Sequence, residues 1–339
     1  MKISASIYSV KDKSPEQLVK ELDAHGIDML HVDCPDSDKV FDDIARIRKI
    51  SSTPIDLHII SAEPEKYFKK IEELRIEYVS FQYENLKSIP VLPKTSSTQF
   101  GLSIVSSTPL SVFQNDVSLN GVEGFSFVMM MSTVPGQSGG EFNRDSFQKI
   151  IEFRNRFPKT RIHVDGGVND EIAYILRVLG VHAVVSGSYL MNHESLGMGM
   201  LSFHRSANGH SKFRVAEFAT PVKYLPVLEK GELNLENVLQ TIEKGGLGFV
   251  LVTDQAGQLA GVISNADVRR GLLKNLGNLG KTDAGALVNP KPVHIQQDAT
   301  VSDIVKVVNG LNFIVLFLPV VDERNVLKGA VLLNNLTRV

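Results

Sequence analysis

Short apolar runs alternate with amphipathic segments over the first part of the chain. Apolar runs that end in polar residues predict strands, whereas an apolar period of 3.6 residues predicts helices. The strand-like runs are Lys2–Tyr8, Asp28–Asp33, Ile55–Ile60, Ile76–Gln82, Phe100–Val105, Val122–Met131, Arg161–Asp165 and His182–Ser186. The helical segments are Ser14–His25, Asp36–Ile50, Pro64–Leu74, Arg144–Phe157 and Asp170–Leu179, with weak helical signals after the fourth and fifth strands. This alternation predicts a parallel α/β fold, and eight strands favour a small closed (β/α)8 TIM barrel.

The pattern changes near residue 198, which we interpret as a domain boundary. Gly197–Met200 leads into a polar stretch over residues 205–211 that has no apolar period. Such stretches are typical of linkers. The sequence therefore predicts a barrel over residues 1–198, a linker over 199–215 and a second domain over 216–339.

The second domain contains an internal repeat. Phe249–Asp254 aligns with Phe317–Asp322 at an offset of 68 residues (317 − 249). The same offset pairs Leu259 with Leu327, Gly261 with Gly329 and Arg270 with Arg338. An ungapped match of this kind indicates two copies of one unit, each a β-hairpin followed by a helix. We place the copies at about residues 216–275 and 284–339.

Four polar residues stand at the C-terminal ends of predicted barrel strands. They are His31 and Asp33 after the second strand, His58 after the third and Asp165 after the seventh. Such ends converge on one face of a barrel, where the active site belongs. Two imidazoles and two carboxylates suit Zn2+, Fe2+ or Mn2+. The alternative interpretation is that each is a solvated or hydrogen-bonded strand-end residue.

Glycine-rich turns follow the sixth, seventh and eighth predicted strands. Their backbone N–H groups can bind a phosphate, and the late-strand loops are the usual phosphate site of a barrel. The candidates are Gly139, Gly140, Gly166, Gly167, Gly187 and Ser188. Gly139 and Gly140 belong to a loop that can close over a substrate. The alternative interpretation is that these are simple turn glycines.

Composition narrows the possible partners. The chain has 339 residues, a formal net charge of −2 and no block of basic residues, so we expect no nucleic-acid partner. The apolar runs are too short to span a bilayer, and the first residues lack the apolar stretch of a signal peptide. The single cysteine, Cys34, excludes an intramolecular disulfide. We therefore expect a cytoplasmic protein with no membrane partner.

A series of short motifs covers nearly all of residues 1–195. The motifs are Ala5–Ser9, His31–Asp33 with Asp36, Asp56–Ile60, Ser80–Glu84, Gly101–Leu102 with Thr108–Pro109, Pro135–Gly140, Val164–Val168 and Val185–Ser188. In identity and order they resemble the ribulose-phosphate 3-epimerase family. The resemblance implies a TIM-barrel isomerase that transfers a proton at C3 of a ketose phosphate.

The same resemblance implies a role for each site residue. One divalent metal would be bound by His31, Asp33, His58 and Asp165. Asp33 and Asp165 would be the base and the acid on opposite faces of the substrate, and Ser6 would hydrogen-bond near the reacting centre. The chemistry agrees, because inversion needs one ionised and one protonated carrier, and the developing oxyanion needs a Lewis acid.

Several positions depart from the family pattern. They are Pro35–Ser37 for Met-Asp-Gly, Ile60 for Met, Gln82 for the fourth-strand His, and Val105–Ser106 for Asn-Pro. We expect these residues around the sugar and not among the metal ligands. The departures therefore leave the identity of the sugar open and bear less on the proton transfer. We expect Cys34 to be a buried neighbour on the opposite side of the strand from Asp33.

The repeated unit resembles the CBS motif, in which a strand ends in Gly-x-x-(Ser/Thr)-x-x-Asp and enters a helix. Gly261, Ser264 and Asp267 match that pattern. The resemblance implies a tandem CBS pair that binds an adenine nucleotide through Ser264 and Asp267. The alternative interpretation makes them an N-cap and a first-turn acid. The second copy has Leu332 and Asn335 at these positions, so we expect one nucleotide site, not two.

Taken together, the resemblances predict a metal-dependent epimerase of ribulose 5-phosphate, xylulose 5-phosphate or a related phosphosugar, regulated by the CBS pair. One alternative is an epimerase of a hexulose phosphate in surface-polysaccharide synthesis. Another is a non-catalytic sensor of a phosphosugar and a nucleotide. The four intact ligand residues argue against the sensor, because binding alone does not need a metal between two acids. We expect the chain to form a homo-oligomer.

Overall fold

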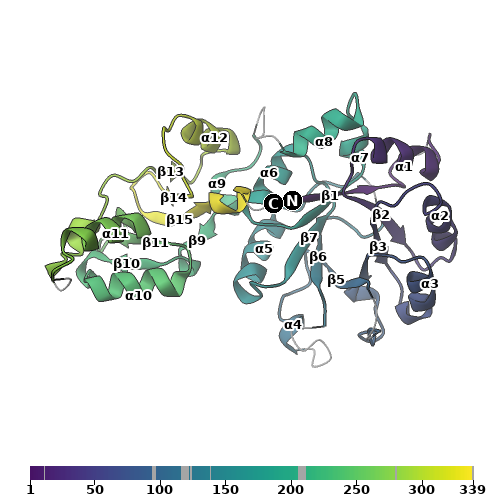
Figure 1. Cartoon of the computed structure of the whole chain (residues 1–339), viewed down its shortest axis with the longest axis horizontal. Helices are drawn as coiled ribbons and strands as arrows, with labels where there is room; N and C mark the ends of the chain where they lie inside the picture. Colours follow the sequence, from purple (N-terminus) through teal and green to yellow (C-terminus); the bar gives the residue numbers. More distant parts are fainter. Residues whose placement is uncertain are drawn as a thin grey trace. The chain divides into compact units, whose positions relative to one another are not determined.

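The computed structural model describes residues 1–10, 12–93, 97–115, 122, 124–137, 139–204, 211–278 and 281–337 (Figure 1). The chain divides into two compact units, on either side of residues 205–210. Arg338, which the repeat pairs with Arg270, lies outside the described residues. Within the described residues, no helix has the length and apolar character needed to cross a membrane.

The first unit is a closed barrel of eight parallel strands in sequential order. The strands are β1 (Lys2–Ser6), β2 (Met29–Cys34), β3 (Ile55–Ile59), β4 (Tyr78–Gln82), β5 (Gln99–Val105), β6 (Phe127–Met131), β7 (Arg161–Asp165) and β8 (Ala183–Ser186). The helical elements of this unit are α1 (Pro15–Ala24), α2 (Lys39–Ile47), η1 (Pro64–Tyr67), α3 (Phe68–Glu73), η2 (Tyr83–Asn85), α4 (Val112–Asn115), α5 (Asp145–Arg156), α6 (Asp170–Val178), α7 (Ser188–Met191) and α8 (Leu196–His204). The helices lie around the ring of strands (Figure 1), and the predicted TIM barrel is confirmed.

Local sequence explains where the helices are strong and where they are weak. Ser14 caps α1, because its side chain accepts a hydrogen bond from the Gln17 N–H and the Gln17 side chain accepts one from the Ser14 N–H. Gly26 follows with a φ of 71°, which glycine adopts without strain. After β4 the described chain forms only η2, and after β5 the helix α4 has 4 residues. Both agree with the weak helical signals there.

Residues 199–204, which the sequence places in a linker, continue the helix α8. This helix contacts α6 and α7, and Phe203 is fully buried. A Cβ atom on Gly199 would lie 2.8 Å from the carbonyl oxygen of Leu190, so the glycine permits this close approach. Glycine inside a helix costs about 1 kcal/mol relative to alanine. Gly197 and Gly199 therefore make residues 196–204 look like a poor helix in the sequence.

The barrel strands carry both an apolar cluster and a set of buried polar side chains. The apolar cluster consists of Met29, Tyr78, Phe127, Met129, Met131, Ala183 and Val185. On β2 to β4 the buried polar side chains are His31, Asp56, His58, Ser80 and Gln82. Buried polar groups are costly unless they pair with one another. These polar side chains therefore have to form hydrogen bonds or ion pairs, and the candidate site lies among them.

The second unit contains two small sheets, with strand orders β10-β11-β12 and β13-β14-β15-β9. Its elements are α9 (Val215–Phe218), β9 (Thr220–Pro221), η3 (Val222–Tyr224), β10 (Val227–Glu229), η4 (Lys230–Glu232), α10 (Leu235–Gly245), β11 (Phe249–Thr253), β12 (Leu259–Ser264), α11 (Asn265–Lys274), η6 (Gly285–Leu287), β13 (Ile295–Gln296), α12 (Val301–Asn309), β14 (Phe317–Val321), β15 (Leu327–Leu332) and η7 (Leu333–Thr337). This is the predicted tandem of CBS-type α+β units.

The two hairpins repeat each other residue by residue. β11 pairs with β12 in the same register as β14 with β15, at the offset of 68 residues seen in the sequence. The side chains of Asp254 and Asp322 each accept two N–H groups of the following turn. The rings of Phe249 and Phe317 stack with centroids 3.6 Å apart. Equivalent residues therefore meet at the junction of the two copies, and the repeat is confirmed.

Gly261 and Gly329 mark the points where another segment crosses each hairpin. Asn289 pairs with Val262, and a Cβ atom on Gly261 would lie 2.6 Å from the Asn289 carbonyl oxygen. A Cβ atom on Gly329 would lie 2.4 Å from the carbonyl oxygen of Thr220 in β9, which pairs with β15. The motif glycine thus makes room for the first residues of the other repeat, so the two copies interlock.

Candidate active site

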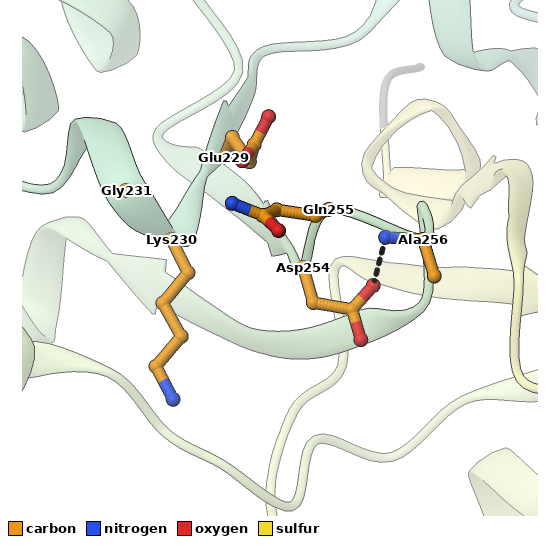
Figure 2. Close-up of a pocket in the computed structure, with 6 residues that line it drawn as sticks. All are labelled: Glu229, Lys230, Gly231, Asp254, Gln255 and Ala256. Carbon is orange, nitrogen blue, oxygen red and sulfur yellow. Dashed lines mark hydrogen bonds between the residues drawn. The ribbon is translucent and has the colours of Figure 1, made fainter.

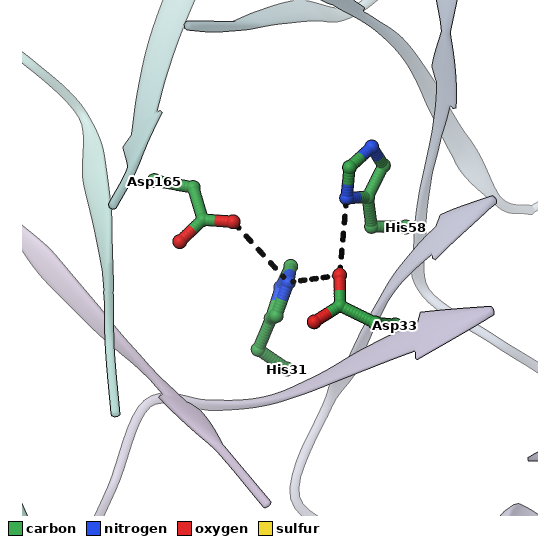
Figure 3. A group of neighbouring side chains, drawn as sticks. All are labelled: His31, Asp33, His58 and Asp165. Carbon is green, nitrogen blue, oxygen red and sulfur yellow. Dashed lines mark hydrogen bonds and ion pairs between the residues drawn. The ribbon is translucent and has the colours of Figure 1, made fainter. Parts of the chain in front are cut away.

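The four residues predicted as metal ligands meet at one point of the barrel. His31 and Asp33 come from β2, His58 from β3 and Asp165 from the end of β7 (Figure 3). One ligand atom of each lies within 4.8 Å of the others. His31 Nε2 is 3.4 Å from Asp33 Oδ1 and 3.7 Å from Asp165 Oδ2. His58 Nδ1 is 3.1 Å from the same Asp33 oxygen.

The pairing of β2 with β3 explains why these side chains come together. His31 is the register partner of Asp56, and Asp33 is the register partner of His58. Side chains two residues apart on a strand point to the same face. The two side chains from β2 and the two from β3, Asp56 and His58, therefore lie on one face of the sheet. Each histidine consequently has an aspartate on the neighbouring strand.

The ring nitrogen of each histidine that faces away from the cluster also has a partner. His31 Nδ1 lies 3.0 Å from Asp56 Oδ2, which also accepts a 2.9 Å hydrogen bond from the Ser4 hydroxyl. His58 Nε2 lies 2.8 Å from Gln82 Oε1. A carboxylate only accepts hydrogen bonds, so Nδ1 of His31 carries a proton, and in the neutral ring the lone pair of Nε2 faces the cluster.

The two aspartates of the cluster differ in acidity. Burial tends to raise the pKa of Asp33, but the neighbouring His31 and His58 outweigh burial and lower this pKa. Burial raises the pKa of Asp165 to about 6, although His31 opposes the shift. Burial tends to lower the pKa of His31, but Asp56 and Asp33 raise it well above its ordinary value. One ionised and one readily protonated carboxyl group suit an acid–base pair.

The atoms that face one another in this cluster fit a divalent cation. His31 Nε2 is buried and makes no hydrogen bond to any residue that the structure describes. It lies beside carboxylate oxygens of Asp33 and Asp165, so lone pairs face lone pairs. A proton or a metal ion between them removes that conflict. Two imidazole nitrogens and two carboxylate oxygens are ligands typical of Zn2+, Fe2+ and Mn2+.

Ser6 and the loop after β8 lie beside the cluster. Ser6 ends β1 and is the register partner of His31. A Cβ atom on Gly187 would lie 3.4 Å from the Ser6 Cβ, so Gly187 and the following Ser188 are close to the end of β1. The geometry is compatible with the predicted roles of these residues.

Gly166 and Gly167 directly follow β7 and pack against the loop after β6. Their φ angles are 105° and 67°. Cβ atoms on them would lie 2.2 Å from Thr133 Oγ1 and 2.4 Å from the Phe142 nitrogen. The loop after β6 also contains two further predicted phosphate-binding residues, Gly139 and Gly140. Close packing of the two loops therefore requires glycine at 166 and 167, and their phosphate contacts stay a prediction.

Asp56 and Gln82 have roles that the sequence did not assign. Asp56 stands two residues before His58 on the same strand face, which is a signal that the motif Asp56–Ile60 already contained. Gln82 is predicted to lie around the sugar, but it bonds to the candidate ligand His58. The sequence could not show this contact, because it depends on how β4 sits beside β3.

Cys34 is fully buried with its Sγ directed at the Ser37 carbonyl, as expected of a neighbour and not a ligand.

Ser264 and Asp267 form a capping box at the start of α11. The Oδ2 atom of Asp267 accepts hydrogen bonds from the Ser264 N–H at 2.9 Å and the Ser264 hydroxyl at 2.5 Å. Its Oδ1 atom pairs with Arg270, whose side chain is 63% exposed. Both oxygens thus have local partners, and a ribose hydroxyl would have to displace Arg270.

A surface hollow of about 500 Å³ lies elsewhere in the second unit (Figure 2). It is lined by Glu229, Lys230, Gly231, Asp254, Gln255 and Ala256. The carboxylate of Asp254 accepts the Ala256 N–H at 2.9 Å, so its charge stabilises the turn. β12 runs from this turn to Ser264, so the hollow and the predicted nucleotide residues lie at opposite ends of the hairpin.

The fold and the site together define a class: a TIM barrel in which two histidines and two aspartates gather at the C-terminal ends of the strands. Residues 2–191 match the family described as "Ribulose-phosphate 3 epimerase family", and residues 284–339 match "CBS domain". The chain belongs to the ribulose-phosphate 3-epimerase family and is an isomerase of the epimerase type.

Curated relatives agree with this assignment. The chain is 31% identical to ribulose-phosphate 3-epimerase of Aquifex aeolicus over 48% of this chain and 77% of the relative. It is 24% identical to the Bacillus subtilis enzyme over 56% of this chain and 91% of the relative. It is 26% identical to the chloroplastic ribulose-5-phosphate-3-epimerase of Arabidopsis thaliana over 55% and 70%.

Solved structures similar to the chain include CBS-pair proteins. CBSX2 from Arabidopsis thaliana is 23% identical with a TM-score of 0.32, covering 37% of this chain and 92% of that one. CBSX2 in complex with AMP is 24% identical with a TM-score of 0.31, covering 37% and 94%. CbpB in complex with c-di-AMP is 21% identical with a TM-score of 0.31, covering 36% and 81%.

Proposed function

We propose that the barrel is a metal-dependent epimerase that inverts C3 of a ketose phosphate, with Asp33 and Asp165 as its two proton carriers. The placement of these aspartates beside His31 Nε2, at 3.4 Å and 3.7 Å, carries the proposal. Their pKa values are displaced in opposite directions, which supports a pair with one base and one acid.

In this proposal the protein's own residues move the proton. The ionised carboxylate of Asp33 removes the C3 proton from one face, and the protonated carboxyl of Asp165 delivers a proton to the opposite face. The reverse direction exchanges the two roles, so the starting base depends on the configuration of the substrate. Both side chains are partly exposed, at 24% and 16%, which supports proton exchange with solvent.

His31, Asp33, His58 and Asp165 would hold one divalent metal, Zn2+, Fe2+ or Mn2+. When bound, the metal supplies a Lewis acid for the negative charge that develops on the substrate oxygens. Asp56 keeps His31 in the tautomer that leaves Nε2 unprotonated. Ser6, next to His31 at the end of β1, is suited to hydrogen-bond the substrate near C3.

A phosphate group completes the proposed substrate. Backbone N–H groups in the loops after β6, β7 and β8 are the candidates to bind it. These loops contain Gly139, Gly140, Gly166, Gly167, Gly187 and Ser188.

Hydrogen exchange at C3 tests the reaction. The metal-replete full-length protein is incubated in D2O with a panel of pentulose and hexulose phosphates, and NMR follows the C3 proton. We expect deuterium uptake with at least one member of the panel, and a loss of at least about a hundredfold in Asp165→Asn, in line with the value of a general acid–base group. No uptake with any member overturns the proposal. The preferred member identifies the sugar, which the departures at Ile60, Gln82 and Val105 leave open.

We propose further that the CBS pair binds one adenine nucleotide and that this binding regulates the barrel. The broken equivalence of the repeats supports a single site, because Leu332 and Asn335 replace Ser264 and Asp267 in the second copy. A neutral amide and an alkyl group accept fewer or weaker hydrogen bonds than a carboxylate and a hydroxyl.

A further inference from the structure

Gln82 connects Glu84 to His58 through two hydrogen bonds. Its Oε1 atom lies 2.8 Å from His58 Nε2, and its amide NH2 donates to Glu84 Oε2. The other oxygen of Glu84 accepts the Val105 N–H at 3.0 Å and the Thr108 hydroxyl. Gln82 is only 1% exposed, so these side chains and not bulk water must satisfy both ends of its amide.

The order of donors and acceptors determines where His58 carries its proton. The Glu84 carboxylate only accepts, so it draws the NH2 group of Gln82 and leaves the carbonyl oxygen facing His58. A carbonyl oxygen also only accepts, so Nε2 of His58 carries a proton. Asp33 Oδ1, which likewise only accepts, lies beside Nδ1, so when a cation binds on that side the single proton of the ring is on Nε2. A neutral imidazole then has an unprotonated Nδ1. That atom lies 3.1 Å from Asp33 Oδ1 and faces the cluster.

We propose that Gln82 and Glu84 are positioning residues that hold His58 in the tautomer whose Nδ1 binds the metal. This inference rests on the proposed function, since it requires a divalent cation among the four cluster residues. Gln82 and Glu84 act through His58 and contact neither the metal nor the reacting carbon.

The backbone that donates to Glu84 is itself fixed by α5. Lys149 donates to the carbonyl oxygens of Val105 at 2.7 Å and Ser106 at 3.2 Å, and also to that of Thr108. Val105 and Thr108 are the residues whose N–H and hydroxyl reach Glu84. The end of β5 therefore holds the carboxylate in place, and the direction of the Gln82 amide follows from it.

A histidine at position 82 can make the same connection. Its ring donates from one nitrogen and accepts at the other, as the two ends of the Gln82 amide do. The epimerase motif that Ser80–Glu84 resembles has histidine here. Gln82→His should therefore preserve the connection, whereas Gln82→Leu, of similar size, removes the hydrogen bonds to both His58 and Glu84.

The test uses full-length protein with Zn2+ as the probe. ¹⁵N NMR of labelled histidine identifies the protonated nitrogen of His58, and chelator competition measures the affinity for Zn2+. We expect the wild type to carry the proton on Nε2 and Zn2+ on Nδ1. Gln82→Leu and Glu84→Gln should weaken Zn2+ binding about 10- to 100-fold, the usual effect of losing such an outer partner. Without metal, both variants should shift His58 toward the Nδ1–H tautomer, and Gln82→His should match the wild type.

Glu77→Gln is the matched control, because Glu77 precedes the opposite end of β4 and bonds there to Arg48 and the Ile55 N–H. It should leave the tautomer and the affinity unchanged. If Gln82→Leu does not fold, the isosteric Glu84→Gln decides the question. Wild-type tautomer and affinity in Glu84→Gln overturn the positioning role but leave the proposed function standing. A wild-type protein that binds no Zn2+, Fe2+ or Mn2+ instead overturns the metal site itself, and this inference with it.

Discussion

At Asp165, burial and the neighbouring histidines shift the pKa in opposite directions. Burial raises its pKa to about 6, with His31 and His58 opposing the shift and Asp33 and Asp56 adding to it. In metal-free protein the folded state therefore binds more protons than the unfolded state between about pH 4 and 6. The contribution of Asp165 to the free energy of unfolding is highest below that range and falls as the pH rises through it.

Replacing Asp165 by asparagine should remove this dependence. The variant stays neutral at every pH, so in the presence of a chelator it should exceed the wild type in stability by about 1–3 kcal/mol at pH 8, and by less at pH 5. Urea unfolding at the two pH values measures the difference. Added metal should reverse the order, because the ionised carboxylate then has a cation to bind. Parallel stability curves for the two proteins without metal would show that Asp165 is not the titrating group.

At the scale of elements, the second unit depends on glycines where segments cross. β12 passes close to Asn289, and a side chain on Gly261 would also meet Val288 Cγ1 at 2.4 Å. Gly261→Ala should therefore force the crossing segment away, at a cost of about 1–3 kcal/mol for overpacking. Hydrogen exchange measured by mass spectrometry should show faster exchange of the β12 amides and no change in the barrel.

Gly277→Ala provides the control for that experiment. A Cβ atom there would meet no other atom within 4 Å, so its β12 amides should exchange as in the wild type. Equal exchange in Gly261→Ala and Gly277→Ala would contradict the crossing argument.

At the scale of the whole molecule, the question is whether nucleotide binding involves the CBS motif or the motif only caps a helix. Calorimetric titration of the full chain with AMP, ADP and ATP should reveal one site per chain that disappears in Asp267→Ala. A charged acceptor contributes about 1.5–3 kcal/mol against about 1 for a neutral one, and the hydroxyl missing at Leu332 removes about 1 kcal/mol more. The cleft with Asn335 should therefore bind roughly 10- to 100-fold more weakly. Barrel activity without nucleotide should survive the substitution.

The capping box of α12 supplies the matched control. Asp303 accepts from the Thr300 N–H and hydroxyl, as Asp267 does from Ser264, but it lies outside the CBS motif. Asp303→Ala loses an equivalent cap and should keep the nucleotide site. Heat from no nucleotide would leave Asp267 as a helix-start acid alone, and two equal sites would contradict the single-site prediction.

Much of the architecture follows from periodicity along the chain. The alternation of apolar runs and amphipathic segments predicts the barrel, and the 68-residue offset predicts the paired hairpins, because both patterns repeat at intervals that the backbone imposes. The sequence misplaces the end of the barrel unit, since glycines in α8 look like a break until Gly199 is seen against Leu190. Helix propensity is local, whereas the packing that overrides it is not.

The candidate site was likewise predictable only in part from the sequence. The sequence by itself determined the chemistry available at the strand ends, His31, Asp33, His58 and Asp165, because parallel strands bring their C-terminal ends to one face. Tertiary structure alone decided which nitrogen of each histidine faces that cluster, since the outer partners Asp56 and Gln82 come from neighbouring strands in a register that no single strand encodes. A tautomer depends on which donors and acceptors surround a ring in space, and that arrangement exists only once the barrel has closed.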